Sequence, residues 1–206
     1  MRGYDEAMSY QHQWAQMIAR DPEHSHRYAE RWRSLAAAGH DLDGEARLID
    51  AMAERDSRIL DAGCGTGRVG AYLAARGHSI VGIDLDEVLI SEARETCPAA
   101  EWHVGDLAET GPEQLGDDFD IAASAGNVMT FLDPASRAAV IANLASVLAP
   151  GGRLITGFGA GRGYDFDEYA DDLARAGLRI EHRFATWTLQ PFAADSDFLV
   201  CVSART

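Results

Sequence analysis

The chain has 206 residues, which is enough for one large domain or for a domain with a helical extension. Hydrophobic residues at 47% and charged residues at 25% are ordinary for a globular enzyme and argue against a disordered or fibrous protein. A formal net charge of -15 repels polyphosphate, so we expect no nucleic-acid partner.

The first 56 residues show helical periodicity without strand alternation, and apolar positions around Trp14, Trp32 and Ile49 predict two or three helices. No apolar signal core follows Arg2, and no apolar run approaches the roughly 20 residues that span a bilayer. We therefore expect a cytoplasmic protein that does not enter membranes. Three scattered cysteines without a paired motif predict reduced thiols and no metal site.

From Arg58 onward, short β-rich runs alternate with alanine-rich helical segments, a texture typical of a parallel sheet covered on both faces. The predicted strands are 59–61, 79–84, 102–104, 119–124 and 153–158. The predicted helices between them are 67–76, 87–96 and 134–148.

The pattern changes after the fifth strand. Residues 167–176 read as a helix that ends at Gly177. Two long strand-like runs follow, 179–189 and 198–204, with no helix between them. Because adjacent strands joined without a crossover must be antiparallel, these runs predict a hairpin.

A glycine-rich turn follows the first predicted strand, in the segment ILDAGCGTGRVG at residues 59–70. A side chain at Gly63 or Gly65 would keep a ligand away from the backbone, and Gly67 allows the next helix to pack closely on the strand. The spacing Gly65-x-Gly67-x-x-Gly70 also matches the dinucleotide fingerprint, with Asp84 where a ribose-binding acid is expected. A nicotinamide or flavin enzyme is therefore an alternative.

Three acids favour a different ligand. Asp61 stands at the mouth of the glycine turn, where its carboxylate would repel a pyrophosphate and attract an ammonium group. Asp84 ends the second strand and Asp106 follows the third. Parallel strands place all three at one carboxyl edge, where doubly wound sheets bind ligands. The segment after residue 158 encodes only a helix and a hairpin, which is short for the second half of a dehydrogenase.

Five segments together resemble, in register, the motifs of the class I S-adenosylmethionine-dependent methyltransferases: Asp61-x-Gly63-x-Gly65-Thr66-Gly67, Gly82-Ile83-Asp84, Gly105-Asp106-Leu107, Phe119-Asp120 and Leu148-x-Pro150-Gly151-Gly152-x-Leu154. The resemblance covers residues 48–204. It implies an α/β fold, a Rossmann-like doubly wound seven-stranded sheet of order 3-2-1-4-5-7-6 with the last strand antiparallel. We accordingly expect an N-terminal helical lid at residues 1–47 and a cofactor-binding domain at residues 48–206.

The resemblance also implies roles for individual residues in binding S-adenosylmethionine. Asp61 and its neighbouring glycines would hold the methionine part, Asp84 the ribose hydroxyls, and Asp106 the adenine amino group. The complete set implied to contact the cofactor is Asp61, Gly63, Cys64, Gly65, Gly67, Asp84, Leu85, Asp106, Leu107 and Ser124.

Two residues are candidates on the acceptor side. Asn127 lies where the chain leaves the fourth strand, which is where family members face the transferred methyl group, although it could equally be a turn amide. His12 lies in the predicted lid and could position or deprotonate an acceptor, or simply be a surface residue.

The sequence thus predicts in-line methyl transfer to a small-molecule acceptor by a monomer or homodimer. The alternatives are a non-catalytic module that binds S-adenosylmethionine or S-adenosylhomocysteine, and an NAD-dependent oxidoreductase.

Overall fold

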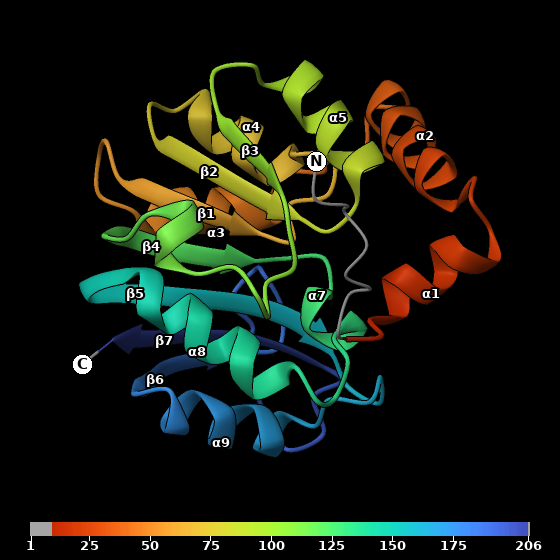
Figure 1. Ribbon diagram of the computed structural model, residues 1–206. Coiled ribbons are helices and arrows are strands. Elements are labelled where there is room, and N and C mark those ends of the chain that lie inside the picture. Colours follow the sequence, from red (N-terminus) through yellow and green to blue (C-terminus); the bar gives the residue numbers. More distant parts are fainter. Residues whose placement is uncertain (1–9, 206) are drawn as a thin grey trace.

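The computed structural model describes residues 10–205, which form a seven-stranded sheet of order β3-β2-β1-β4-β5-β7-β6 (Figure 1). The strands are β1 (Arg58–Ala62), β2 (Ser79–Asp84), β3 (Glu101–Val104), β4 (Phe119–Ser124), β5 (Leu148–Gly159), β6 (Leu178–Phe184) and β7 (Phe198–Arg205). Strands β1 to β5 are parallel, and β7 is antiparallel to both β5 and β6. The predicted fold class and strand order are confirmed.

Nine helices surround the sheet within the same residues. They are α1 (Gln13–Arg20), α2 (His24–Ala37), α3 (Gly44–Met52), α4 (Arg68–Ala74), α5 (Glu87–Thr96), α6 (Pro112–Leu115), α7 (Val128–Phe131), α8 (Arg137–Val147) and α9 (Phe166–Arg175). In this described part of the chain, none of them is long and apolar enough to cross a membrane.

Two predicted boundaries were wrong. Strand β6 ends at Phe184 rather than at residue 189, because the chain turns back: the Ala185 N–H donates to the Gln190 carbonyl at 2.8 Å and Leu189 adopts a φ of +64°. Strand β5 begins at Leu148, five residues before the predicted start, so the preceding helix is shorter than expected. Neither change moves the carboxyl edge of the parallel strands.

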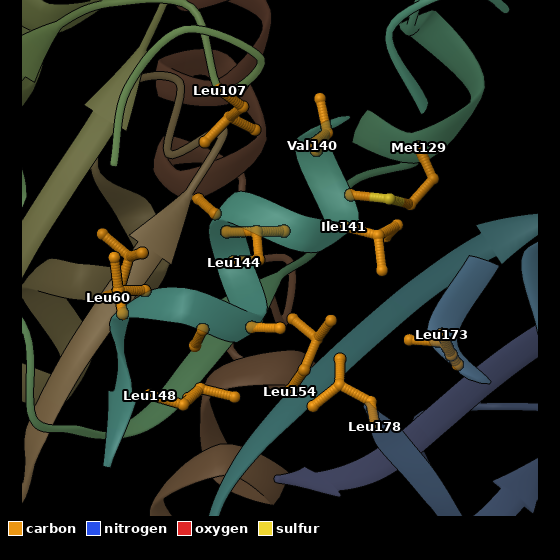
Figure 2. Packing of buried hydrophobic residues seen from close by; sticks show 14 of the residues in the cluster. Leu60, Leu107, Met129, Val140, Ile141, Leu144, Leu148, Leu154, Leu173 and Leu178 are labelled. Carbon is orange, nitrogen blue, oxygen red and sulfur yellow. The ribbon is translucent and has the colours of Figure 1, made fainter. Parts of the chain in front are cut away.

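Side chains on successive strand residues face opposite sides of the sheet and fill two separate cores. On β1, Leu60 joins the core beneath α8 and α9, whereas Ile59 joins the core beneath α3, α4 and α5. Figure 2 shows the first core, in which Ile141 and Leu144 of α8 point toward the sheet and lie near Leu154. The helices on both faces hold the strands, and hence their carboxyl ends, in fixed positions.

Trp102 of β3 fixes the glycine turn against the sheet. Its ring fills the space that a side chain would need at Gly67, Gly70 and Gly82. A β-carbon on Gly82 would lie 2.2 Å from the ring, and one on Gly67 would lie 2.9 Å from it. These glycines therefore allow α4 to begin directly after β1 and to pack closely on β2 and β3, as the sequence predicted for Gly67.

The N-terminal helices lie at the carboxyl edge of the sheet. In Figure 1, α1 and α2 lie beyond the arrowheads of β1, β2 and β4. Helix α2 packs on α5, and α3 packs on α4. Helix α3 crosses the predicted boundary between residues 47 and 48, and the division into lid and cofactor domain stays a prediction. Residues 1–9, which contribute to the expectation of a cytoplasmic protein, lie outside the described residues.

Candidate active site

A cavity opens at the carboxyl edge of the sheet. Its empty space, counted together with the solvent in its open mouth, is about 1200 Å³. The glycine turn after β1, the ends of β2 and β3 and the segment after β4 form its floor. Side chains of α2, together with His12 and Trp14 next to the start of α1, form its cover.

The glycine turn presents bare backbone to the cavity. Gly63 and Gly65 have φ angles of +76° and +53°, a region that other residues rarely adopt. The N–H groups of Gly63 and Cys64 donate to the carbonyl of Ile83, at 2.8 and 3.0 Å, and so tie the turn to the end of β2. Around the position of a Gly65 β-carbon, the nearest atom is Cε1 of Tyr28 at 3.8 Å. A ligand can therefore approach the Gly65 backbone closely.

Asp61 is buried beneath the glycine turn, with 2% of its surface exposed. Its Oδ2 accepts the N–H of Gly70 in the first turn of α4 at 2.9 Å. Burial raises the pKa of Asp61 to about 7, and the Gly70 hydrogen bond opposes part of this increase. No donor among residues 10–205 contacts Oδ1, so this oxygen is available to a cationic group in the cavity.

Asp84, the last residue of β2, holds two backbone donors. Its Oδ2 accepts the N–H of Gly65 at 2.8 Å, and its Oδ1 accepts the N–H of Asp86 at 3.0 Å. Each carboxylate oxygen keeps a lone pair for a second donor, so the group can receive two neighbouring hydroxyls. Burial raises the pKa of Asp84 to about 6, against the effect of these backbone hydrogen bonds.

Asp106 contacts His12, which the sequence singled out as a candidate on the acceptor side. Its Oδ2 lies 2.8 Å from His12 Nε2, while its Oδ1 accepts the N–H of Ala108 at 2.8 Å. The Nδ1 of His12 accepts the N–H of Asp133 at 3.0 Å, so the ring proton must be on Nε2, which donates to Asp106. Burial acts to raise the pKa of Asp106, but the His12 and Ala108 hydrogen bonds outweigh it and lower that pKa below its usual value.

Asp86 joins both N-terminal helices to the sheet, a role that the sequence did not reveal. Its Oδ1 caps the first turn of α5, and its Oδ2 accepts from Trp14 Nε1 at 2.8 Å and from the Ser25 hydroxyl at 2.5 Å. The side chain is 4% exposed. The sequence gives no signal of the contacts with Trp14 and Ser25, because an aspartate at this position is also what an ordinary helix N-cap requires.

Aromatic side chains form the wall of the cavity under the N-terminal helices. The ring of Trp14 meets those of Tyr28 and Phe131 edge to face, with centroids 5.1 and 5.8 Å apart. The Arg68 guanidinium lies 4.8 Å from the Trp32 ring and pairs with Glu45. The cover is therefore packed against the floor on both sides of the cavity.

Asn127 joins the segment that follows β4 to the end of β5. It has a φ of +66°, and its Oδ1 accepts the N–H of Gly159 at 2.9 Å. The oxygen is thus engaged by backbone, and the side-chain amino group is the part left to donate. Asn127 lines the cavity beside Phe131 and Leu132.

The cavity brings together nearly all of the residues singled out in the sequence. Asn127 and His12 line it, as do all of the proposed cofactor contacts except Gly67 and Ser124. Gly67 packs beneath Trp102, and Ser124 is fully buried in β4 with no hydrogen-bond partner for its hydroxyl among residues 10–205. The individual roles in cofactor and acceptor binding stay predictions. The described residues contain no cluster of His, Cys, Asp or Glu that could hold a metal ion.

The charges of the cavity fit S-adenosylmethionine better than a dinucleotide. Carboxylates of Asp61, Asp84 and Asp106 stand beside the glycine turn, where the nearby Arg68 is paired with Glu45; the other arginine of the cavity, Arg162, follows β5. Such a surface repels a pyrophosphate. An ammonium group, ribose hydroxyls and an adenine amino group are all donors, and these carboxylates can accept from each of them.

Comparison with known proteins identifies the family of the chain. A family model described as a methyltransferase domain matches residues 59–152. The crystal structure of a TehB-like S-adenosylmethionine-dependent methyltransferase from Corynebacterium glutamicum is 49% identical, has a TM-score of 0.87, and aligns over 90% of this chain and 100% of that one.

Two curated relatives match over shorter regions. An 18S rRNA (guanine-N(7))-methyltransferase from Bos taurus is 32% identical over 52% of this chain and 41% of its own length. A dTDP-3-amino-3,4,6-trideoxy-alpha-D-glucopyranose N,N-dimethyltransferase from Streptomyces venezuelae is 28% identical over 62% of this chain and 52% of its own length. The chain thus spans about half the length of these relatives. The identity of 49% over the whole TehB-like structure shows that the chain belongs to the S-adenosylmethionine-dependent methyltransferases.

Proposed function

We propose that the protein transfers the methyl group of S-adenosylmethionine to a small molecule. The observation that carries this proposal is the continuous cavity that runs from the acids beside the glycine turn to Asn127 and Phe131, beneath α2 and the start of α1. An acceptor at the Asn127 end must fit under these helices, which favours a small molecule over a polymer.

The charge of the chain supports the same choice of acceptor. The two curated relatives act, by their names, on a ribosomal RNA and on an amino sugar nucleotide, so family membership alone leaves the acceptor open. A net charge of -15 disfavours binding to RNA, whose affinity for proteins depends largely on basic contacts to phosphate.

In the proposed reaction, the protein aligns two ligands and excludes water. The cofactor, when bound, supplies a methyl group already activated on a sulfonium. Asp61 and Asp84 would hold the cofactor through its ammonium and ribose groups, in the same cavity that Asn127 lines. Trp14 and Phe131 would shield the acceptor from solvent. Alignment of this kind can supply much of the rate enhancement of a displacement reaction.

The predicted role of His12 in deprotonating an acceptor stays a prediction, and the contacts in the structure favour a positioning role. Both ring nitrogens are engaged, one by the Asp133 N–H and the other by Asp106. His12 could accept a proton only by breaking the bond to Asp133. We therefore propose that His12 holds the start of α1 against the end of β3.

The buried acids make cofactor binding depend on pH. In the empty protein Asp61 has a pKa of about 7, so it is increasingly protonated below neutral pH and then attracts an ammonium group only weakly. We expect the affinity for S-adenosylhomocysteine to fall as the pH is lowered from about 8 to about 6, with release of roughly half a proton per binding event near pH 7. Calorimetry in buffers of different ionisation enthalpy measures both quantities.

The Asp61→Asn variant is the matched control for this pH dependence. It should bind weakly at every pH and release no proton from this site. Because the pKa of Asp61 is raised in the folded, ligand-free wild type, protonation of this group stabilises the folded state at acid pH. This stabilisation is lost as the pH rises from about 4 toward about 7. The empty variant should therefore be at least as heat-stable as the wild type at pH 8. An affinity of the wild type that is flat between pH 6 and 8 would refute the proposed ammonium contact.

A methylation screen with methyl-labelled cofactor tests the proposed function. Phenols, amines, thiols, carboxylic acids and bulk RNA are each incubated with the protein, and we expect label to enter at least one small-molecule class. Label in RNA alone would overturn the choice of acceptor. Binding of S-adenosylhomocysteine without transfer to any class would favour the non-catalytic module. The cytoplasmic location and the monomeric or dimeric state stay predictions.

A further inference from the structure

We propose that the acceptor carries a carboxylate, held by Arg162 and by the amino group of Asn127. This inference rests on the proposed function and specifies its substrate class. It begins from the distribution of charge along the cavity, which is uneven. Asp61 and Asp84 lie at the ends of β1 and β2 and Asp106 follows β3, whereas Asn127 and Arg162 follow β4 and β5.

The order of the sheet separates these two groups. β3, β2 and β1 occupy one half of the carboxyl edge, and β4 and β5 lie beyond β1. The carboxylates and the donors therefore line different parts of one cavity, with Asp61 on β1 nearest to the donor side. The acidic half suits a cationic cofactor. The other half offers N–H groups, and it is where an acceptor would have to lie to face the methyl group.

Arg162 keeps its hydrogen-bonding capacity for a ligand. It lines the cavity, yet it makes no ion pair or hydrogen bond with any residue from 10 to 205. The other arginine that lines the cavity, Arg68, is paired with Glu45. In a chain with a net charge of -15, a guanidinium at a cavity wall without such a partner is suited to an anionic ligand.

Asn127 supplies a second donor at the same place. Its Oδ1 accepts the Gly159 N–H, and this bond fixes which side of the amide carries the oxygen. The amino group therefore lies on the other side and can donate to a ligand. Arg162 Nε and Asn127 Oδ1 lie 3.4 and 3.6 Å from the position that a β-carbon on Gly159 would take, which places the two side chains close together. A planar carboxylate can accept from both groups at once.

The segment that carries Arg162 is anchored on both sides. The Ala160 N–H donates to the Asp197 carbonyl at 2.8 Å, and the Arg137 guanidinium donates to the Gly163 carbonyl at 2.7 Å. Gly161 and Gly163, which flank Arg162, both have positive φ angles that suit glycine. The backbone is therefore held beside the cavity before any ligand binds, and the exposed Arg162 side chain can turn toward a ligand there.

The test compares carboxylic acids with their neutral amides. Matched pairs of phenolic, amino and thiol acceptors, each as the acid and as the primary amide, are assayed with labelled cofactor. We expect the wild type to use acids with kcat/KM about tenfold to a hundredfold higher than the amides, since hydrogen bonds to charged groups differ from neutral ones by that factor. In Arg162→Gln we expect this preference to disappear and in Arg162→Lys to return in part.

Two controls separate the possible outcomes. Arg31→Gln removes the same charge outside the cavity and should leave the preference for acids unchanged. Calorimetry with S-adenosylhomocysteine should give equal affinities for the wild type and Arg162→Gln. A large loss of this affinity would mean that Arg162 binds the carboxylate of the cofactor instead, and would overturn the inference.

The remaining outcomes distinguish this inference from the proposed function. Methyl transfer to amides or amines as efficient as to acids would refute the carboxylate site and leave the methyltransferase proposal standing. Preference for phosphate esters over carboxylic acids would also refute it. Binding of S-adenosylhomocysteine with no transfer to any member of the panel would count against the proposed function itself, and the inference would fail with it.

Discussion

Replacement of Asp84 by alanine is expected to weaken the binding of S-adenosylhomocysteine by about a hundredfold or more, because two hydrogen bonds to a charged group are lost. Both oxygens of Asp84 already accept backbone N–H groups, and this fixes the carboxylate in position for ribose hydroxyls. Loss of the carboxylate also frees the Gly65 N–H, and with it part of the glycine turn. Calorimetry at about pH 8, where a group with a pKa of about 6 is ionised, measures the effect.

Asp120→Ala is the matched control. The Asp120 carboxylate likewise accepts one backbone N–H, that of Arg58 at 2.8 Å, but it lies at the start of β4 and does not line the cavity. This variant should bind S-adenosylhomocysteine as the wild type does. If Asp84→Ala, folded by circular dichroism, bound with wild-type affinity, the ribose contact assigned to Asp84 would be wrong.

Replacement of Gly65 by valine is expected to abolish cofactor binding while leaving the protein folded. The space around a Gly65 β-carbon holds no protein atom closer than 3.8 Å among the described residues, so a valine side chain would project into the cavity rather than into the core. It would occupy the surface on which the methionine part is expected to lie. We expect no rise in melting temperature on adding S-adenosylhomocysteine.

The backbone strain of this substitution requires its own control, because Gly65 has a φ of +53°. Gly39 has a φ of +76° and does not line the cavity, and no atom of residues 10–205 lies within 4 Å of the position that a β-carbon on it would take. Gly39→Val should therefore lower stability by a comparable amount and still show the full ligand-induced shift. A full shift in Gly65→Val would mean that the ligand does not approach this backbone.

The strands and helices between Arg58 and Phe158 could be predicted from local signals, whereas the order of the sheet was implied by the resemblance to the methyltransferase family. Strand and helix textures alternate from Arg58 to Phe158. Three of the five motifs lie where β1, β2 and β3 end, and the other two lie where β4 and β5 begin. The end of β6 could not be predicted, because residues with strand propensity continue past Phe184. Pairing with β7 ends there because the chain turns back and the Ala185 N–H donates to the Gln190 carbonyl instead.

The site was predicted less completely than the fold. Asp61, Asp84 and Asp106 could be placed from sequence, because each lies at or just after the carboxyl end of a predicted parallel strand. The contacts of His12 with Asp106 and of Trp14 with Asp86 join residues 94 and 72 positions apart and leave no mark on local pattern. Such contacts depend on how the N-terminal helices dock, which periodicity does not determine.

The most direct test of the ligand assignment is calorimetric titration of the wild type with S-adenosylhomocysteine and, separately, with NAD at about pH 8. We expect saturable binding of the adenosyl amino acid and none of the dinucleotide, because the carboxylates beside the glycine turn attract an ammonium group and repel a pyrophosphate. Binding of NAD, or no binding of S-adenosylhomocysteine by folded protein, would contradict it.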